Sequence, residues 1–258
     1  MDKRKPVVAA NWKMNGNLSL IEEILSSFQK TPETLQEHDV LLHLPYVFLD
    51  FALEKKFNHD IKIQIGAQNL SQYEQGAYTG EISSIMLKEL GCSSVLVGHS
   101  ERRGIFKEDN AVVAQKFSLA IESNLTPILC VGENLEQRES GKYLDIILEQ
   151  LSSVIELNGI NALTKSIIAY EPVWAIGTGK NASPEQAQEI HLAIRSFLQT
   201  KDKPVSEQVR IIYGGSVNPN NAETILNQKD IDGVLVGGAS LSSIDFVSIC
   251  EISKKVGN

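Results

Sequence analysis

Lys13, His99 and Glu171 each stand at the carboxyl end of a short run of residues that is otherwise uncharged. A carboxylate can accept a proton, an imidazole can polarise a carbonyl or transfer a proton near neutral pH, and an ammonium group can stabilise negative charge. Together they suit proton transfer on a small anionic molecule. A single charge at a strand end is more often only a solvated loop residue, so the fold must bring the three together.

The alternation of side chains along a strand predicts which residues share a face with these three groups. The predicted faces are Val7, Ala9, Asn11 and Lys13; Val95, Val97 and His99; and Ile167, Ala169 and Glu171. If the three runs are parallel strands of one barrel, their carboxyl ends meet at a single mouth. We therefore expect the ammonium, imidazole and carboxylate groups to converge there.

Eight apolar runs recur along the chain, as expected for parallel strands that are covered on both faces. They are Val7–Trp12, Val40–Leu44, Ile61–Ile65, Val95–Gly98, Pro127–Val131, Ile167–Tyr170, Val209–Tyr213 and Gly233–Val236. The amphipathic segments between them predict helices, among them Leu18–Gln29, Ile82–Leu90, Asn110–Glu122, Leu144–Leu157 and Glu185–Leu198. Ser183, Pro184 and Gln186 give the last of these a capping-box start.

Eight strand–helix units of roughly 32 residues each have the usual size of a repeat in a closed (β/α)8 barrel. The rival fold is a doubly wound open sheet, which would normally carry G-x-G-x-x-G after its first strand. Asn11-Trp12-Lys13 stands at that position instead. We therefore predict an α/β chain whose residues 1–258 form a single (β/α)8 barrel domain.

The composition limits the classes of partner and the cellular location. The chain has 258 residues, with 24 basic and 32 acidic side chains, so its net charge of −8 argues against a nucleic-acid or anionic-membrane partner. No apolar run approaches the roughly 18 residues needed to span a membrane. Cys92, Cys130 and Cys250 form no close pair, which argues against a zinc site or a disulfide framework. We expect a cytoplasmic protein.

His99 precedes Ser100-Glu101-Arg102-Arg103, which has the pattern of a short helical turn. A ring nitrogen there can accept a hydrogen bond from an exposed helix N–H group, and the helix start disfavours added positive charge. We therefore expect a neutral imidazole that donates its other N–H to a carbonyl oxygen. The alternative is a buried histidine with a structural role only.

The segment after Glu171 has an apolar tip between a proline and a glycine-rich end. Its residues are Val173, Trp174, Ala175, Ile176, Gly177, Thr178 and Gly179. Pro172 favours an extended conformation at Glu171, and an indole in a solvent-facing loop is useful if the loop covers something. We predict a lid that excludes water from the site. The alternative is a loop that packs permanently on neighbouring helices.

Two glycine pairs follow the last two predicted strands, in Tyr213-Gly214-Gly215-Ser216 and in Gly237-Gly238. Without a Cβ in the way, backbone N–H groups can approach an anion closely, and this is the usual place for a phosphate site in such a barrel. Together with Lys13 they predict a site for a small phosphate ester.

The sequence resembles the triosephosphate isomerase family in strings that run in family order from residue 7 to about residue 241. They are Asn11-Trp12-Lys13-Met14-Asn15-Gly16, Ala67-Gln68-Asn69, Gly76-Ala77-Tyr78-Thr79-Gly80-Glu81, Val97-Gly98-His99-Ser100-Glu101-Arg102-Arg103, Cys130-Val131-Gly132-Glu133, Gln137-Arg138-Glu139, Tyr170-Glu171-Pro172-Val173-Trp174-Ala175-Ile176-Gly177-Thr178-Gly179, Tyr213-Gly214-Gly215-Ser216-Val217 and Val236-Gly237-Gly238-Ala239. The resemblance implies a TIM barrel that interconverts dihydroxyacetone phosphate and D-glyceraldehyde 3-phosphate, without cofactor or metal, in glycolysis and gluconeogenesis.

The resemblance also implies a role for each matching residue. Glu171 matches the base, His99 the electrophile, Lys13 the cation that faces the substrate, and Asn11 a neighbouring hydrogen-bond donor. In that family the surroundings of the base and of the imidazole tune their protonation. Glu101 matches a carboxylate near Lys13. The matching phosphate-binding positions are Gly177, Ser216, Gly237 and Gly238.

Members of that family are usually homodimers, and Thr79 matches a loop that reaches the partner near its Asn11 and Lys13. The chain departs from commoner family wording at Leu70-Ser71-Gln72-Tyr73-Glu74, Ala10, Leu44-Pro45 and Gly104. None of these positions is catalytic, so they bear on packing between subunits.

Two other functions are compatible with parts of the pattern. One is a catalytically silent barrel that only binds a ligand, although Asn11, Lys13, His99 and Glu171 are all intact. The other is a different phosphate-binding barrel enzyme, such as an aldolase or a synthase. A Schiff-base aldolase needs a desolvated lysine on a central strand, and only the strand-end Lys13 is near.

Overall fold

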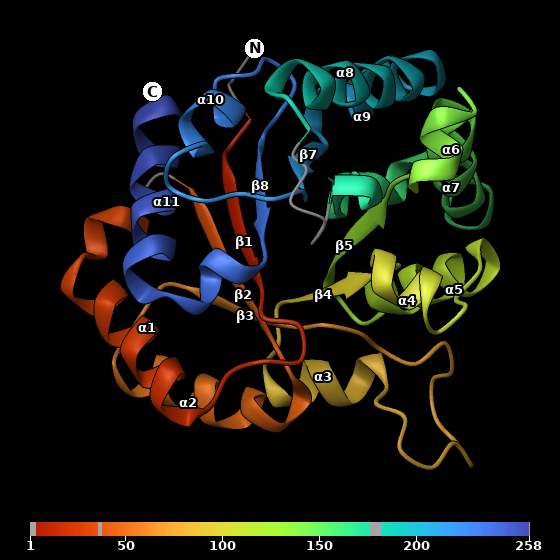
Figure 1. Ribbon diagram of the computed structural model, residues 1–258. Coiled ribbons are helices and arrows are strands. Elements are labelled where there is room, and N and C mark those ends of the chain that lie inside the picture. The colour runs from red at the N-terminus through yellow and green to blue at the C-terminus, as the bar shows by residue number, and fades with distance from the viewer. Residues whose placement is uncertain (1–3, 36–37, 176–181, 258) are drawn as a thin grey trace.

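Eight parallel strands close into a barrel in the order β1 to β8, and helices surround it (Figure 1). The computed structural model describes residues 4–35, 38–175 and 182–257. The strands are β1 Val7–Asn11, β2 Asp39–Leu44, β3 Gln64–Ala67, β4 Ser94–Val97, β5 Thr126–Val131, β6 Ile167–Tyr170, β7 Arg210–Tyr213 and β8 Gly233–Val236. The predicted (β/α)8 barrel is confirmed.

The helices follow the strands in sequence and pack on the outside of the barrel (Figure 1). They are α1 Leu18–Lys30, α2 Leu49–Asn58, α3 Ser84–Leu90, α4 Ser100–Gly104, α5 Asn110–Glu122, α6 Leu135–Glu139, α7 Tyr143–Asn158, α8 Pro184–Lys201, α9 Lys203–Gln208, α10 Ala222–Leu226 and α11 Ser243–Gly257. Short 3-10 helices are η1 Pro32–Leu35, η2 Tyr46–Phe48, η3 Ile160–Lys165, η4 Val173–Ala175 and η5 Gly238–Leu241. None of the described helices has both the length and the apolar character that a membrane crossing requires.

The predicted helices agree with the structure to within a few residues, because their ends are marked by local capping chemistry. The predicted capping box at the start of α8 is present, with Ser183 accepting from the Gln186 N–H and the Gln186 side chain accepting from the Ser183 N–H. At the start of α3 Ser83 caps the helix, so the helix begins at Ser84 and not at Ile82 as predicted.

The core has two layers, one inside the barrel and one between barrel and helices. The inner layer is a cluster of Val7, Ala9, Leu41, Leu96, Ile128, Cys130, Ile167, Ala169, Ile212 and Leu235. The larger outer cluster contains the alternate strand residues together with the apolar faces of the helices. Burial on both sides explains why the strands are apolar at both parities.

Two details of the predicted strands were wrong. The third strand was expected at Ile61–Ile65 but lies at Gln64–Ala67, because Ile61 and Ile63 are buried in the outer layer before pairing with β2 begins at Gln64. An apolar run indicates burial, and burial extends beyond the hydrogen-bonded ladder.

The faces of β4 were also assigned wrongly. Val95 and Val97 pack in the outer layer, whereas Leu96 points into the barrel. His99 therefore does not continue the face of the two valines. Gly98 has a φ of 72°, which interrupts the strand alternation, and His99 is redirected by this turn.

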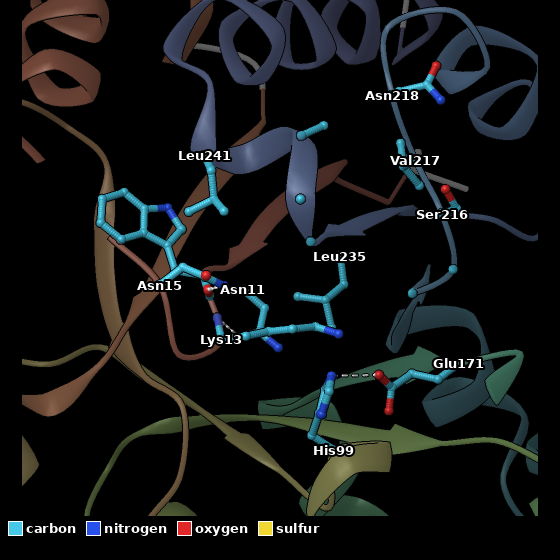
Figure 2. A pocket seen from close by; sticks show the side chains of 16 residues that line it. Asn11, Lys13, Asn15, His99, Glu171, Ser216, Val217, Asn218, Leu235 and Leu241 are labelled. Carbon is cyan, nitrogen blue, oxygen red and sulfur yellow. Dashed lines mark hydrogen bonds and ion pairs between the residues drawn. The ribbon is translucent and has the colours of Figure 1, made fainter. Parts of the chain in front are cut away.

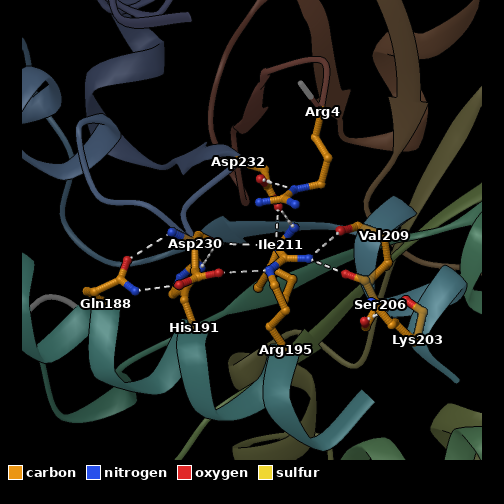
Figure 3. Close-up of polar contacts among 10 residues, drawn as sticks. All are labelled: Arg4, Gln188, His191, Arg195, Lys203, Ser206, Val209, Ile211, Asp230 and Asp232. Carbon is orange, nitrogen blue, oxygen red and sulfur yellow. Dashed lines mark hydrogen bonds and ion pairs between the residues drawn. The ribbon is translucent and has the colours of Figure 1, made fainter. Parts of the chain in front are cut away.

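The amino-terminal ends of β7 and β8 are joined by an extensive network of polar contacts centred on Arg195 of α8 (Figure 3). Its guanidinium binds the carboxylates of Asp230 and Asp232 and the carbonyls of Ser206 and Val209. Asp232 also accepts hydrogen bonds from Arg4 and from the Ile211 N–H, and Asp230 accepts one from Gln188 Nε2. This end of the barrel is fixed by contacts among its own residues.

Candidate active site

Asn11 ends β1, and Lys13 follows it in a left-handed conformation with a φ of 53°. That conformation costs a residue with a Cβ about 1 kcal/mol. Two hydrogen bonds hold it: the Lys13 N–H donates to Asn11 Oδ1 at 3.0 Å, and Gln68 Nε2 donates to the Lys13 carbonyl at 2.9 Å. Lys13 Nζ in turn lies 2.6 Å from Glu101 Oε1. The ammonium group is therefore positioned from both ends.

His99 caps the short helix α4 with its own side chain. Its Nδ1 accepts a hydrogen bond from the Glu101 N–H at 3.3 Å, and its Nε2 lies 2.9 Å from Glu171 Oε1. A nitrogen that accepts must be unprotonated, so this geometry places the proton on Nε2. Gly98 is required at the turn because a Cβ there would lie 2.9 Å from Val113 Cγ1.

Glu171 follows β6 and is almost fully buried, with 2% of its surface exposed. Its N–H donates to the Val131 carbonyl at 2.8 Å, and its carboxylate also accepts from the Ser100 N–H at 2.9 Å. Gly132 lies against this residue, since a Cβ at Gly132 would come within 1.9 Å of the Glu171 carbonyl oxygen. The carboxylate is thus held by its neighbours on both sides, β5 and α4.

The buried carboxylate and imidazole shift each other's titration. Burial raises the pKa of Glu171, but the charge and hydrogen bond of His99 and the Ser100 N–H lower that pKa by more, so it lies below its usual value. Burial lowers the pKa of His99, and contact with Glu171 raises that pKa by more, so it lies above its usual value. Glu171 is therefore ionised at neutral pH, as a base must be. The raised pKa of His99 opposes the neutral imidazole that the sequence predicted, whereas the hydrogen bond from the Glu101 N–H to Nδ1 favours it.

A cavity of about 390 Å³ opens between these groups and the loops after β7 and β8 (Figure 2). It is lined by Asn11, Lys13, His99 and Glu171 together with Ser216, Gly237 and Gly238. Gly237 lies against Lys13, because a Cβ there would be 3.9 Å from Lys13 Cε, and a Cβ at Gly238 would meet nothing within 4 Å. The mouth thus combines one carboxylate, one imidazole and one ammonium with loops whose backbone is open to a ligand.

The other predicted site residues do not line this cavity or lie outside the described residues. Glu101 contacts Lys13 and lines a second groove beside the cavity. Val173, Trp174 and Ala175 form η4, and Trp174 Nε1 donates to Glu133 Oε1 at 2.8 Å. Ile176, Gly177, Thr178 and Gly179 lie outside the described residues. Thr79 is exposed in the segment between β3 and α3 that extends away from the barrel (Figure 1).

Two functional contacts were missed by sequence reasoning. Gln68 follows β3 and holds the Lys13 carbonyl. The strand-end rule that selected Lys13 considered ionisable groups only, so it did not select this amide. Glu133 is fully buried and accepts from Tyr170, Trp174 and Arg138. Arg138 is only five positions away, but Tyr170 and Trp174 are 37 and 41 positions away, so no local pattern shows this role.

Within the parts of the chain that the structure describes, no three His, Cys, Asp or Glu side chains are grouped so as to hold a metal ion.

The fold and the cavity define the class: a (β/α)8 barrel with acid–base groups and glycine-rich loops at the carboxyl ends of its strands. The family model for triosephosphate isomerase matches residues 6–253. Proteins named triosephosphate isomerase from Shewanella frigidimarina, Shewanella denitrificans and Shewanella loihica are 49%, 48% and 47% identical to this chain, each over 98% of the chain and 99% of the relative. The chain therefore belongs to the triosephosphate isomerase family.

Proposed function

We propose that this protein is a triosephosphate isomerase, which interconverts dihydroxyacetone phosphate and D-glyceraldehyde 3-phosphate in glycolysis and gluconeogenesis, without cofactor or metal. The observation that carries the proposal is the convergence of Glu171, His99 and Lys13 on one cavity. The reaction moves one proton between adjacent carbons and a second between the two oxygens. It therefore needs a base, a proton donor at oxygen and a counter-charge for the enediolate.

Each group has a position that suits its part. Glu171 is ionised and buried, so it can remove the proton from carbon. His99 carries its proton on Nε2, the nitrogen that faces Glu171 at 2.9 Å, so a substrate carbonyl that enters between them would meet that N–H. Lys13 and Asn11 face the developing negative charge on oxygen. Ser216, Gly237 and Gly238 would hold the phosphate, as would Gly177.

Lid closure by residues 173–179 remains part of the proposal. The described part of this segment is anchored at Glu133 through Trp174. A closed lid would exclude water from the enediolate, which otherwise eliminates phosphate.

A coupled assay tests the activity directly: conversion of glyceraldehyde 3-phosphate should far exceed the uncatalysed rate. Turnover at the uncatalysed rate would favour the silent binding protein instead. Lys13 pairs with Glu101 and is not desolvated like a Schiff-base lysine, since 29% of its side chain is exposed. Trapping of a substrate adduct on Lys13 by borohydride would nevertheless favour an aldolase.

The proposed enzyme is a homodimer in which the Thr79 loop enters the groove beside the partner's site. That groove, about 380 Å³, is lined by Met14, Tyr46, Val47 and Phe106 as well as Lys13. Met14 and Val47 are 95% and 81% exposed in the single chain, which favours a covering partner. The rings of Tyr73 and Tyr78 stack within the loop, with their centroids 3.9 Å apart, and this contact favours one shape of the loop.

The size of the protein in solution tests the dimer. Light scattering should give twice the chain mass, and Thr79→Arg should shift the equilibrium toward the monomer. A monomer at micromolar concentration would contradict the dimer without affecting the proposed chemistry. The cytoplasmic location stays a prediction.

A further inference from the structure

A fully buried histidine lies inside the barrel directly below the mouth. His43 is on β2, two residues beyond Leu41 of the inner layer, and pairs in register with Asn11 of β1 and Gly66 of β3. The proposed chemistry does not use it. A polar ring in this layer needs a reason, because the corresponding positions in the other half of the barrel are apolar.

The hydrogen bonds of the ring define its protonation. Nδ1 lies 3.0 Å from the Ala10 carbonyl, which can only accept, so Nδ1 carries the proton. Nε2 lies 3.0 Å from Ser94 Oγ and accepts from that hydroxyl. Burial lowers the pKa of His43 to about 4, which keeps the ring neutral. Both nitrogens are thus satisfied without a charge.

The ring occupies a space that neighbouring residues leave open. A Cβ at Gly66 would lie 2.4 Å from Ser94 Oγ and 2.7 Å from His43 Cδ2. Glycine at position 66 and the small Ser94 together make room for the imidazole. The ring is therefore closely confined and has a fixed direction toward β1.

The backbone carbonyl of His43 also contacts the segment that carries Asn11 and Lys13. The His43 carbonyl accepts from the Trp12 N–H and from Gln68 Nε2, both at 3.2 Å. Gln68 Nε2 also donates to the Lys13 carbonyl at 2.9 Å. The contacts of His43 therefore include the residue before Asn11, the residue after it and, through Gln68, Lys13 itself.

We propose that His43 is a positioning residue, whose Nδ1–H bond to the Ala10 carbonyl, with Gln68, holds Asn11 and the left-handed Lys13 in the geometry that the substrate requires. The proposal rests on the proposed isomerase activity. Lys13 needs such support because its backbone conformation is unfavourable on its own.

Two substitutions separate positioning from packing. In His43→Asn the amide N–H lies close to the former position of Nδ1. In His43→Gln the amide reaches toward the former position of Nε2, so no N–H donates to the Ala10 carbonyl. Glutamine fills the space better, so a role in packing alone predicts that His43→Gln is milder in both melting temperature and activity. Positioning predicts the opposite order for kcat/KM.

We expect His43→Asn to retain most of kcat/KM, and His43→Gln to lose about 10-fold or more, as small displacements of catalytic groups do. The melting temperature should follow the reverse order. Ser94→Ala, which leaves the Ala10 bond intact, should keep kcat/KM close to that of the unchanged chain. A kcat/KM of His43→Gln equal to or above that of His43→Asn would overturn the proposal.

Amide hydrogen exchange tests the same idea without relying on activity. The Trp12 and Lys13 amides should exchange faster in His43→Gln than in His43→Asn, while the Gly214 amide, which bonds to Tyr170 on the other side of the barrel, should not change. If the unchanged chain lacks isomerase activity, the proposed function fails and exchange still decides on positioning. Where neither His43 variant folds, Gln68→Leu should speed exchange at Lys13, and unchanged exchange there would refute the proposal.

Discussion

The two ends of the barrel carry ionic groups that are arranged in opposite ways. At the amino-terminal end, Arg195 contacts two carboxylates and three carbonyls of the protein (Figure 3). At the mouth, Lys13 has one carboxylate partner, Glu101, and the Glu171 carboxylate accepts from the Ser100 N–H. The contact of Glu171 with His99 lies beside an open cavity (Figure 2).

The difference follows from what each end does. A charged side chain with several fixed partners is immobile and holds strand ends together. Its hydrogen bonds are already made within the protein, so it has none left to offer a ligand. Charges with one or two partners beside a cavity can exchange a partner for substrate. We therefore expect substitutions at the mouth to lower activity far more than stability, and substitutions at the amino-terminal end to do the reverse.

Glu171→Gln should give the largest effect on activity. The amide keeps the shape of the side chain but cannot accept the proton from carbon, so kcat should fall by about 10³-fold or more. Binding of a phosphate ester should persist, because the loops after β7 and β8 are unchanged. Steady-state kinetics and inhibitor binding measure both. Activity close to that of the unchanged chain would remove Glu171 as the base.

Arg195→Met should give the largest effect on stability. It leaves Asp230 and Asp232 short of a buried counter-charge, so the free energy of unfolding should fall by about 3 kcal/mol while kcat of the folded protein is retained. Lys203→Ala provides the control, because that lysine is 63% exposed and pairs with Glu207 at 3.8 Å. Its effect should stay within about 0.5 kcal/mol. Equal urea midpoints for the two variants would contradict the comparison.

The contrast between the ends also shows what the sequence could predict. The mouth was predictable, because a polar residue that ends an apolar strand is visible locally and parallel strands bring such ends together. The faces of β1 and β6 followed strand alternation, with Val7 and Ala9, and Ile167 and Ala169, in the inner layer.

Other features depended on geometry that local patterns do not contain. The turn at Gly98 separates His99 from the face of Val95 and Val97, and the position of β3 depends on where its pairing with β2 begins. The Arg195 network joins Arg4 to residues more than 180 positions away, through Asp232. The His43 contacts likewise link β2 to Ala10 and Ser94. The closed barrel brings these residues together, and their spacing along the chain does not indicate the contacts.

Trp174→Phe tests a case between the two extremes. Glu133 is fully buried with several partners, like the amino-terminal network, yet one of those partners belongs to the predicted lid. Loss of the indole N–H should lower the free energy of unfolding by about 1 kcal/mol. Burial already raises the pKa of Glu133, and the Trp174 bond opposes that rise, so the variant should raise this pKa further. Urea unfolding measures the change in free energy, and NMR of the side-chain carboxyl measures the change in pKa. An unchanged carboxyl titration would mean that the hydrogen bond from Trp174 does not lower the pKa of Glu133.

The smallest expected effect is the dependence of stability on pH at the mouth. The pKa of Glu171 is below its usual 4.5, so its contribution is present above that value and is lost as pH falls through the lowered pKa. The pKa of His99 is above its usual 6.5, so its contribution is complete below pH 6.5 and is lost as pH rises through the raised pKa. The pair should stabilise the fold most between about pH 4.5 and 6.5. The stability difference between the unchanged chain and Glu171→Gln should therefore be larger at pH 6 than at pH 9, by urea unfolding at each pH. An equal difference at both values would mean that His99 gains no proton affinity from Glu171, and that the mouth is no more responsive to protons than the amino-terminal end.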